Sequence, residues 1–241
     1  MSIFEKDILN FDCVSSTFDK LKEYDKDKVL AVVSKRQTGG VGRMGRRWSS
    51  DEGGLYFSFY MEKNENSNDI PFLTILCALA AFKTISDYTP CRIKWPNDIV
   101  SDGKKICGIL AKSLVSGNDI TIMAGVGINV NNEIPDDLSY KAVSLKEILK
   151  KDFNTDEILN KFFKNLEKLY TCSKEEIMDG YRENCVTLGS EVSVDFLSGN
   201  KVIKGKCVNI SDDGTLDIET ENGICNVNSG EVSVRGIYGY V

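Results

Sequence analysis

The sequence predicts an α+β fold, in which a mixed, mostly antiparallel sheet packs with helices and a small all-β domain follows. Apolar strand-like runs and helical runs are interspersed without the regular alternation of a doubly wound fold. Residues 144–185 carry repeated helix-start signals, and from Leu188 onward short alternating segments are separated by turn sequences. We place a domain boundary near Asn184, which divides the chain into residues 1–184 and 185–241.

The first domain contains several predicted strands and one apolar helix. Residues 29–34 and 55–62 are apolar runs typical of strands, and residues 72–86 form a run long enough for a helix. After Pro90, CRIKWPNDIV predicts a short strand that ends in a turn. KKICGILAKSL and DITIMAGVGINVN predict a hairpin with its turn at residues 116–119.

The second half changes from helices to short strands. SLKE, NTDE and SKEE each place Ser or Asn three residues before Glu, which is the spacing of a helix capping box. The apolar positions between them predict successive helices. EVSVDF, KVIKGKCVNI, GTLDIET, ICNVN and EVSVR then alternate in hydrophobicity between turns, which is typical of a small β-barrel of about fifty residues.

Composition excludes several classes of function. The chain has 241 residues, 41% of them hydrophobic, and a net charge of −6, so it can bury a core and should repel nucleic acid. Its N-terminus has no signal-like apolar run, and the run at residues 72–82 is too short to span a bilayer. We therefore expect a cytoplasmic protein. Eight scattered cysteines without a C-x-x-C pair, and no histidine, predict reduced thiols and no zinc site. We also expect no haem and no flavin.

A basic, glycine-rich stretch, QTGGVGRMGRRW, contrasts with the acidic chain. Glycines let a backbone approach a ligand closely, and arginines offer planar donor forks that suit carboxylates and phosphates. The stretch therefore predicts a small anionic ligand, although by itself a mobile surface loop is an equally good interpretation. Residues 35–50 contain no acidic residue and five cations, Lys35, Arg36, Arg43, Arg46 and Arg47.

Two further motifs carry polar groups at the ends of strands. In KWPNDIV and the following KKICGIL, Lys94 and Lys105 flank a turn whose Asn97 and Asp98 suit a lysine, a nucleotide edge or Mg²⁺. Taken alone, the Pro-Asn-Asp sequence is simply a tight turn. In AGVGINVN, glycines inside an apolar strand indicate a bulge or a close backbone approach, and Asn129 follows.

Together these motifs resemble those of the biotin protein ligase family. QTGGVGRMGRRW, KWPND, KICGIL and GVGINVN occur in the family's order, and the family's loop reads roughly GRGRRGR followed by W. SSTFD resembles the family's S-T-N element, and LGSEV through SGEVSVR resembles its C-terminal SH3-like barrel, which is expected to pack beside the active site. Bifunctional members carry an N-terminal helix-turn-helix, and a catalytic domain that begins within about twenty residues of Met1 implies a monofunctional ligase.

The resemblance implies an enzyme that converts biotin and MgATP to biotinyl-5′-AMP and pyrophosphate. The biotinyl group then passes to a lysine of a carboxylase's biotin carboxyl carrier domain. The implied partners are thus biotin, ATP and this carrier domain, with no DNA or membrane binding and with a homodimer as one possible assembly. The implied catalytic domain is the biotin/lipoate ligase-like one, so a lipoate or octanoyl ligase and a non-catalytic biotin-binding relative remain the alternatives.

The family's functional residues map onto positions of this sequence. Arg43, Lys94 and Lys105 match catalytic positions, with Arg43 and Lys105 at the biotin carboxylate and the acyl phosphate. The implied biotin-binding residues are Ser16, Thr17, Phe18, Gln37, Gly40, Val41, Gly42, Arg43, Lys105 and Gly108. The implied ATP-binding residues are Arg43, Arg46, Trp48, Asn97, Asp98 and Asn129, with Asp98 also a ligand of Mg²⁺.

Three positions depart from the family's pattern. Val41 stands where the loop usually has its first arginine, and Phe18 replaces the asparagine of S-T-N. Lys112 stands where many members have glutamate. A charge-assisted hydrogen bond of the missing arginine is worth roughly 1.5–3 kcal/mol, so we expect an active ligase with weaker biotin binding.

Overall fold

The computed structural model describes most of the chain in five stretches. The described residues are 6–61, 70–116, 119–196, 202–229 and 232–236. The tip of the predicted hairpin and two predicted turns of the C-terminal region lie outside them, at residues 117–118, 197–201 and 230–231. Within the described residues, no helix is both long and apolar enough to cross a membrane.

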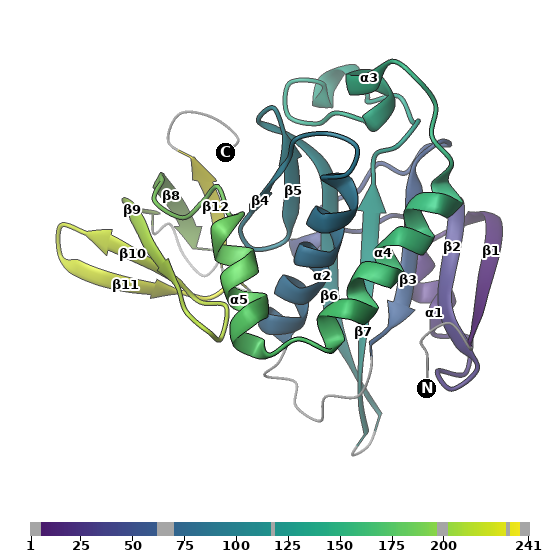
Figure 1. Ribbon diagram of the computed structural model, residues 1–241, viewed down its shortest axis with the longest axis horizontal. Helices are drawn as coiled ribbons and strands as arrows, with labels where there is room; N and C mark the ends of the chain where they lie inside the picture. The colour runs from purple at the N-terminus through teal and green to yellow at the C-terminus, as the bar shows by residue number, and fades with distance from the viewer. Residues whose placement is uncertain (1–5, 62–69, 117–118, 197–201, 230–231, 237–241) are drawn as a thin grey trace.

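A seven-stranded sheet forms the centre of the N-terminal part of the chain (Figure 1), in the order β1-β2-β3-β7-β6-β5-β4. The β1 and β2 strands are parallel and all other neighbours are antiparallel, which confirms the predicted mixed sheet. The strands are β1 Asp7–Val14, β2 Val29–Gln37, β3 Leu55–Tyr60, β4 Arg92–Lys94, β5 Asp98–Ser101, β6 Lys104–Ser116 and β7 Asp119–Ile128.

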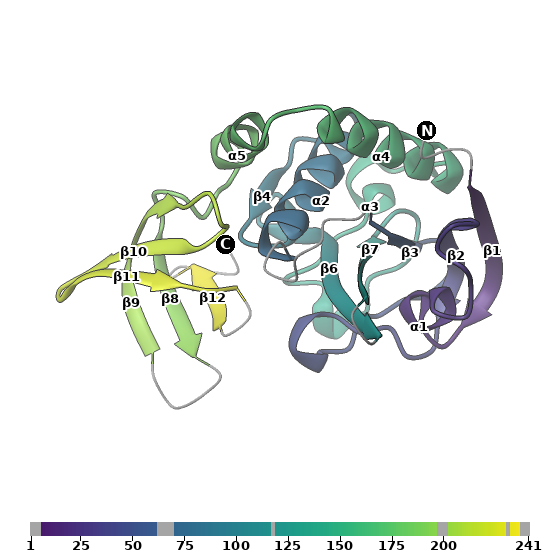
Figure 2. The same cartoon turned by 90° about the horizontal axis from the view of Figure 1, so that it is seen from below.

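Helices cover both faces of this sheet. Figure 2 shows α2 (Ile70–Ile85) and α4 (Thr155–Tyr170) on one side and the short α1 (Thr17–Leu21) on the other. The α2 helix is apolar on every side because it lies between the sheet and α4, where eleven of its residues are buried. Four phenylalanines join α4 to β3, with the ring centroids of Phe57 and Phe162 5.0 Å apart. The larger part of the core therefore lies on the α2 and α4 side, and a smaller cluster of Leu21, Val29, Val32 and Met123 lies under α1.

The three predicted helix starts all begin helices. Ser144 and Ser173 complete capping boxes at the starts of α3 (Leu145–Leu149) and α5 (Lys174–Glu183). Asn154 caps α4 differently, because its side-chain oxygen accepts from the backbone N–H of Asp156.

The C-terminal region forms a second, five-stranded antiparallel sheet, in the order β11-β10-β9-β8-β12. This confirms the predicted small all-β unit. The two outer strands, β11 and β12, do not pair with each other in the described part of the chain, so the sheet is open there, whereas a barrel requires its end strands to meet. The strands are β8 Glu191–Phe196, β9 Val202–Ile210, β10 Leu216–Thr220, β11 Gly223–Val227 and β12 Val232–Gly236.

The cysteines support the prediction of reduced thiols. All eight are free, and four of them, Cys77, Cys107, Cys185 and Cys207, are buried. Burial raises the pKa of the Cys91 and Cys207 thiols to about 12, so both are protonated at neutral pH. These side chains act as small apolar core residues.

Candidate active site

A cavity of about 760 Å³ lies on the face of the large sheet that carries α1. Its floor is made of small residues, because side chains alternate between the two faces of a strand. On β7, Ala124 and Val126 point into the core, whereas Gly125 and Gly127 lie under the cavity. Gly125 pairs with Ser58 of β3, and Gly127 pairs with Gly108 of β6. The missing side chains leave the space that a ligand can occupy.

Trp48 fills one side of this floor. A β-carbon at Gly127 would lie 2.6 Å from its indole Nε1 and Cε2, and one at Gly108 would lie 2.8 Å from its Cζ3. The close approach predicted for the glycines of AGVGINVN is therefore confirmed at Gly127. The Lys105 ammonium lies 5.0 Å from the centre of the Trp48 ring, within cation–π range.

The basic loop is closed on itself by backbone hydrogen bonds. Gly42 N–H donates to the Arg46 carbonyl at 2.7 Å, and Trp48 N–H donates to the Gly40 carbonyl at 2.9 Å. Val41 and Arg47 pair as an isolated bridge on either side of a 3-10 turn at Arg43–Gly45. This ordered conformation favours a binding loop over the alternative of an unstructured surface loop.

Arg43 reaches from the loop to the turn between β4 and β5. Its Nη1 donates to Asn97 Oδ1 at 2.9 Å, and its Nη2 donates to the backbone carbonyl of Ser229. Asn97 is itself fixed, because its Nδ2 donates to the Ile109 carbonyl at 2.7 Å. Burial lowers the pKa of the Arg43 guanidinium, and the nearby Asp98 carboxylate opposes this effect. Arginine nevertheless stays charged at neutral pH.

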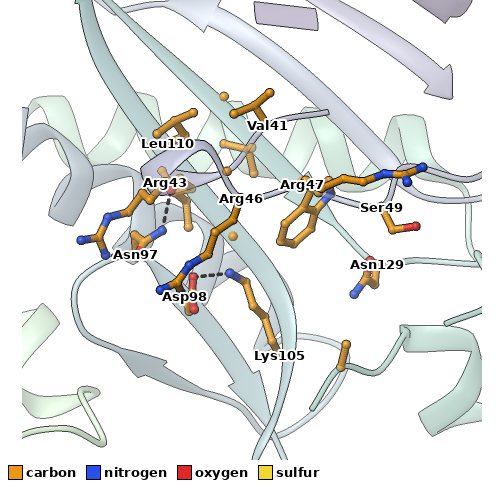
Figure 3. Close-up of a pocket in the computed structure, with 18 of the residues that line it drawn as sticks. Val41, Arg43, Arg46, Arg47, Ser49, Asn97, Asp98, Lys105, Leu110 and Asn129 are labelled. Atoms are coloured by element: carbon orange, nitrogen blue, oxygen red, sulfur yellow. Dashed lines mark hydrogen bonds and ion pairs between the residues drawn. The ribbon is translucent and has the colours of Figure 1, made fainter. Parts of the chain in front are cut away.

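Lys105 and Asp98 form an ion pair beside this arginine. Lys105 Nζ lies 2.5 Å from Asp98 Oδ1, and the two side chains are 22% and 14% exposed. Figure 3 shows Arg43, Arg46 and Lys105 converging around Asn97 and Asp98, whereas Arg47 points the other way. Lys94, at the end of β4, lines the same cavity and is 6% exposed. This end of the cavity is strongly cationic.

The opposite end of the cavity carries neutral polar groups. Thr17 donates to Gln37 Oε1 through its backbone N–H at 2.8 Å and through its hydroxyl at 3.1 Å. The Thr17 hydroxyl also lies 2.8 Å from Ser58 Oγ, and Gln37 Nε2 donates to Ser50 Oγ at 2.9 Å. One end of the cavity can therefore hydrogen-bond an uncharged polar ring, while the other can hold anions.

Comparison with known proteins identifies the family to which the chain belongs. The family model described as the biotin/lipoate A/B protein ligase family matches residues 10–129, and the biotin protein ligase C-terminal domain model matches residues 187–235. The structure of biotin protein ligase from Aquifex aeolicus in complex with biotin and ATP is 37% identical, with a TM-score of 0.83. That match covers 96% of this chain and 99% of the Aquifex chain. The chain belongs to the biotin protein ligase family.

Two curated relatives differ from the chain in length. The bifunctional ligase/repressor BirA of Bacillus subtilis is 31% identical over 84% of this chain, which spans 65% of that relative. The biotin--[acetyl-CoA-carboxylase] ligase of Mycobacterium tuberculosis is 24% identical over 84% of this chain and 78% of the relative.

Most positions that match the family's motifs line the cavity. Gly40 is the exception, because it is buried in the loop, where a β-carbon would lie 2.7 Å from both Ser50 Oγ and the Trp48 carbonyl oxygen. The lining residues are Ser16, Thr17, Phe18, Gln37, Val41, Gly42, Arg43, Arg46, Trp48, Lys94, Asn97, Asp98, Lys105, Gly108 and Asn129. Their individual roles stay predictions.

The positions that depart from the family's pattern differ in where they lie. Val41 lines the cavity and is 47% exposed. Phe18 also lines it, and the Lys112 ammonium lies 5.6 Å from the Phe18 ring centre without lining the cavity itself. Lys112 therefore lies beside a residue of the cavity wall without belonging to the wall.

Sequence reasoning missed a second wall of the cavity, formed by residues 132–142. Asn132 Nδ2 donates to Asn129 Oδ1 at 3.2 Å, and Lys105 N–H donates to the Lys141 carbonyl at 2.8 Å. Val234 of the C-terminal sheet also lines the cavity, as expected for a barrel beside the active site. The asparagine cluster in NVNNEI was the local signal for this wall, whereas Val234 itself was marked by no local pattern and only its region was expected there from the family resemblance.

Proposed function

We propose that the protein joins biotin to ATP, giving biotinyl-5′-AMP and pyrophosphate, and then transfers the biotinyl group to a lysine of a biotin carboxyl carrier domain. The observation that carries this proposal is the cationic end of the cavity. Arg43 and Lys105 come from separate segments, and the turn between β4 and β5 orients both, through Asn97 and Asp98. This pair faces a neutral polar end at Thr17 and Gln37.

The first step joins two anions. A biotin carboxylate oxygen attacks the α-phosphorus of ATP, a new P–O bond forms, and pyrophosphate leaves with the electrons of the broken bond. Fixed cations lower this barrier because they neutralise the reactants and the charge that develops on the phosphoryl oxygens. Arg43 supplies a planar fork and Lys105 a point charge, a combination suited to a carboxylate beside a phosphate.

The neutral end of the cavity suits the ureido ring of biotin. The ureido carbonyl needs donors and its N–H groups need acceptors. Ser16 and Thr17 offer hydroxyls, and Gln37 offers an amide that Thr17 and Ser50 already hold in place. Gly125, next to Phe18, leaves room for the bicyclic ring on the sheet. This arrangement supports the proposed biotin-binding residues.

The nucleotide side lies across Trp48. Arg46 and Lys94 line the cationic end, where phosphates would bind, and Asn129 and Asn132 form a connected pair of amides that can read the edge of a base. Among the described residues that line the cavity, Asp98 is the one carboxylate, and no cluster of three metal-ligating side chains occurs in the described part of the chain. Mg²⁺ keeps most of its waters and binds through one or two carboxylates plus substrate phosphates, so Asp98 fits it and would hold it through water. Bound there, it would supply further positive charge at the phosphates.

In the second step the ε-amine of the carrier lysine attacks the acyl carbon of biotinyl-5′-AMP. An amide bond forms, the acyl–phosphate bond breaks, and AMP leaves. The M. tuberculosis relative, whose name specifies acetyl-CoA carboxylase, supports a carboxylase as the carrier's source. We further propose that residues 1–184 form the catalytic domain and residues 185–241 the C-terminal domain. A cytoplasmic location, the absence of DNA binding and a homodimer stay predictions.

Biotin-dependent exchange of labelled pyrophosphate into ATP tests the first step. We expect exchange with biotin and Mg²⁺, and none with lipoate or octanoate in parallel assays. Exchange with lipoate or octanoate but not with biotin would instead identify the protein as a lipoate or octanoyl ligase. Mass spectrometry of a carrier domain after incubation with the protein, biotin and ATP then tests transfer, with an expected gain of one biotinyl group.

A pair of neighbouring lysines provides the matched control. Lys105→Gln removes the ammonium beside Asp98, and we expect exchange to fall by at least about a hundredfold, as for the loss of a key electrostatic group. Lys104→Gln changes the preceding residue of β6, which does not line the cavity, and should leave exchange unchanged. Equal activity of the two variants would contradict the role assigned to Lys105.

A further inference from the structure

We propose that Trp95 is a positioning residue, through which the C-terminal sheet sets the geometry of the nucleotide side of the site. The inference rests on the proposed function and deepens it. Trp95 lies inside the KWPND motif, between Lys94 and Pro96, and it is 2% exposed. It acts through the neighbouring residues Asn97 and Asp98, which hold the two principal cations.

The Trp95–Asn97 segment is the tip of a short hairpin. Lys94 of β4 and Asp98 of β5 are its last paired residues, so Trp95 and Pro96 lie beyond the ladder, whereas the Asn97 carbonyl still accepts from the Ile109 N–H of β6 at 2.9 Å. A tip of this kind depends on contacts from other parts of the chain for its exact conformation. A shift of the tip acts directly on Asn97 and reaches Asp98, the residue that follows it.

Three contacts with later parts of the chain hold this tip. The Trp95 indole N–H donates to the Gly214 carbonyl at 3.0 Å, and the Trp95 backbone N–H donates to the Thr187 hydroxyl at 3.0 Å. The Tyr181 hydroxyl donates to the Pro96 carbonyl at 3.0 Å. The first partner lies between β9 and β10, the second just before β8 and the third on α5.

The turn that carries Gly214 is itself tightly held. Ser211 N–H donates to the Thr215 carbonyl at 2.9 Å, and Gly214 N–H donates to the Ser211 carbonyl at 2.8 Å. Gly214 has a φ of +86°, and a β-carbon there would lie 3.0 Å from Ile75 Cδ1 and 3.2 Å from Pro71 Cβ. The turn is therefore seated against the start of α2, where only glycine fits without strain.

Arg182 fixes the other side of this turn to α5. Its Nε donates to the Ile210 carbonyl at 2.8 Å, and its Nη2 donates to Asp212 Oδ1 at 2.5 Å. The Gly214 carbonyl is thus an acceptor whose position is set from two sides, by α2 and by α5. A hydrogen bond from so rigid a support orients the indole ring and, with it, the tip of the hairpin.

A core tryptophan that only fills space would make a different prediction. Loss of packing lowers the free energy of unfolding. It reduces the fraction of folded protein and so weakens the apparent binding of ATP and of biotin by the same factor. A positioning role affects ATP more than biotin, because Asn97 lies in the tip and Asp98 directly follows it, whereas Thr17 and Gln37 at the neutral end are held by Ser58 and Ser50. The two roles therefore separate in the affinities for ATP and for biotin.

The first experiment is the Trp95→Phe variant of the full chain. Phenylalanine keeps an aromatic ring and removes the indole N–H that donates to Gly214. We expect the Kd for ATP, measured by calorimetry, to rise about three- to tenfold, as for loss of one buried hydrogen bond. The KM for ATP in pyrophosphate exchange should rise in parallel, while the Kd for biotin, whose carboxylate is assigned to Arg43 and Lys105, should rise by a smaller factor.

A second variant tests the same tip through the other contact. Thr187→Val removes the hydroxyl that accepts from the Trp95 backbone N–H, and Thr187→Ser keeps it. We expect the valine variant to weaken ATP binding and the serine variant to retain it. Thr84→Val is the control, because its buried hydroxyl donates to the Ala80 carbonyl inside α2 and lies outside the cavity.

The outcomes separate this inference from the proposed function. A larger loss of affinity for ATP than for biotin in Trp95→Phe and Thr187→Val, with Thr84→Val unaffected, supports the positioning role. Unchanged ATP binding, or equal weakening of both ligands, overturns it. If the unsubstituted protein binds ATP and biotin but shows no biotin-dependent exchange, the proposed function is refuted. The ATP affinities of the variants then still decide the role of Trp95. If the unsubstituted protein does not bind ATP, both the proposed function and the role of Trp95 are refuted.

Discussion

Replacing Gly127 by alanine should damage the ATP side of the site selectively. The new β-carbon would lie 2.6 Å from Trp48 Nε1 and Cε2 and 2.9 Å from Cζ2. Ordinary carbon contacts lie at about 3.5–4.0 Å, so the indole must move by about 1 Å. Trp48 also neighbours the Lys105 ammonium, so this movement reaches a principal cation of the site.

The expected magnitude follows from this displacement. A misplacement of about 1 Å can cost on the order of a hundredfold in rate, and overpacking typically costs about 1–3 kcal/mol of stability. We expect Gly127→Ala to raise the KM for ATP and to lower kcat in pyrophosphate exchange by about ten- to a hundredfold. The KM for biotin should change much less.

Gly125→Ala, two residues earlier on the same strand, is the matched comparison. Its β-carbon would lie 3.2 Å from Ser58 Oγ and 3.3 Å from Phe18 Cδ2, at the biotin end of the cavity. This variant should therefore raise the KM for biotin more than the KM for ATP. Gly180→Ala, in α5 and 3.4 Å from Leu79 Cδ2, should leave both unchanged. The reasoning fails if Gly125→Ala and Gly127→Ala affect the two substrates in the same ratio.

Further predictions concern binding and stability. Val41→Arg, at a half-exposed position of the loop, should tighten biotin binding by up to about tenfold in calorimetry, and no gain would argue against a missing donor there. Phe162→Ala should lower the free energy of unfolding in urea by about 3–5 kcal/mol, because its ring is fully buried between α4 and β3, and a loss below about 1 kcal/mol would contradict this packing. Ser173→Ala should cost about 1 kcal/mol through the lost cap of α5, whereas Ser173→Asp should cost much less. Burial raises the thiol pKa of Cys91 and Cys207 from 9.0 to about 12, so as the pH rises these thiols lose their protons in the unfolded chain before they do in the folded one. The free energy of unfolding should therefore fall as the pH rises above 9, and urea unfolding at pH 8 and pH 10 measures the difference.

The sequence predicted most elements because their signals are local. The apolar run at Val29, the hairpin of β6 and β7, and the capping boxes at Ser144 and Ser173 each follow from side chains within one turn or one strand pair. The strand β1 escaped prediction. DILNFDCV is an exposed edge strand with polar residues on both faces, so it lacks the alternation that burial imposes.

The motifs also brought the candidate site into view before the fold was known. The basic loop, KWPND and the glycines of AGVGINVN place charged residues, polar residues and glycines close together. Packing of a core does not require these residues at such positions, so their presence indicates a functional site. The wall at residues 132–142 carries ordinary residues, and its place follows from its backbone pairing with Lys105. Apart from the asparagines at its start, nothing in its composition distinguishes it from a surface loop.

By itself, the sequence determined the α+β class, the family's motifs and the kinds of charge that the site would carry. Tertiary structure decided which polar groups come into contact. Arg43 and Asn97 are 54 residues apart and form a 2.9 Å hydrogen bond, and Trp95 and Gly214 are 119 residues apart and form one at 3.0 Å. Such contacts depend on how two sheets and a helix pack in three dimensions, and periodicity and capping signals report only on neighbours along the chain.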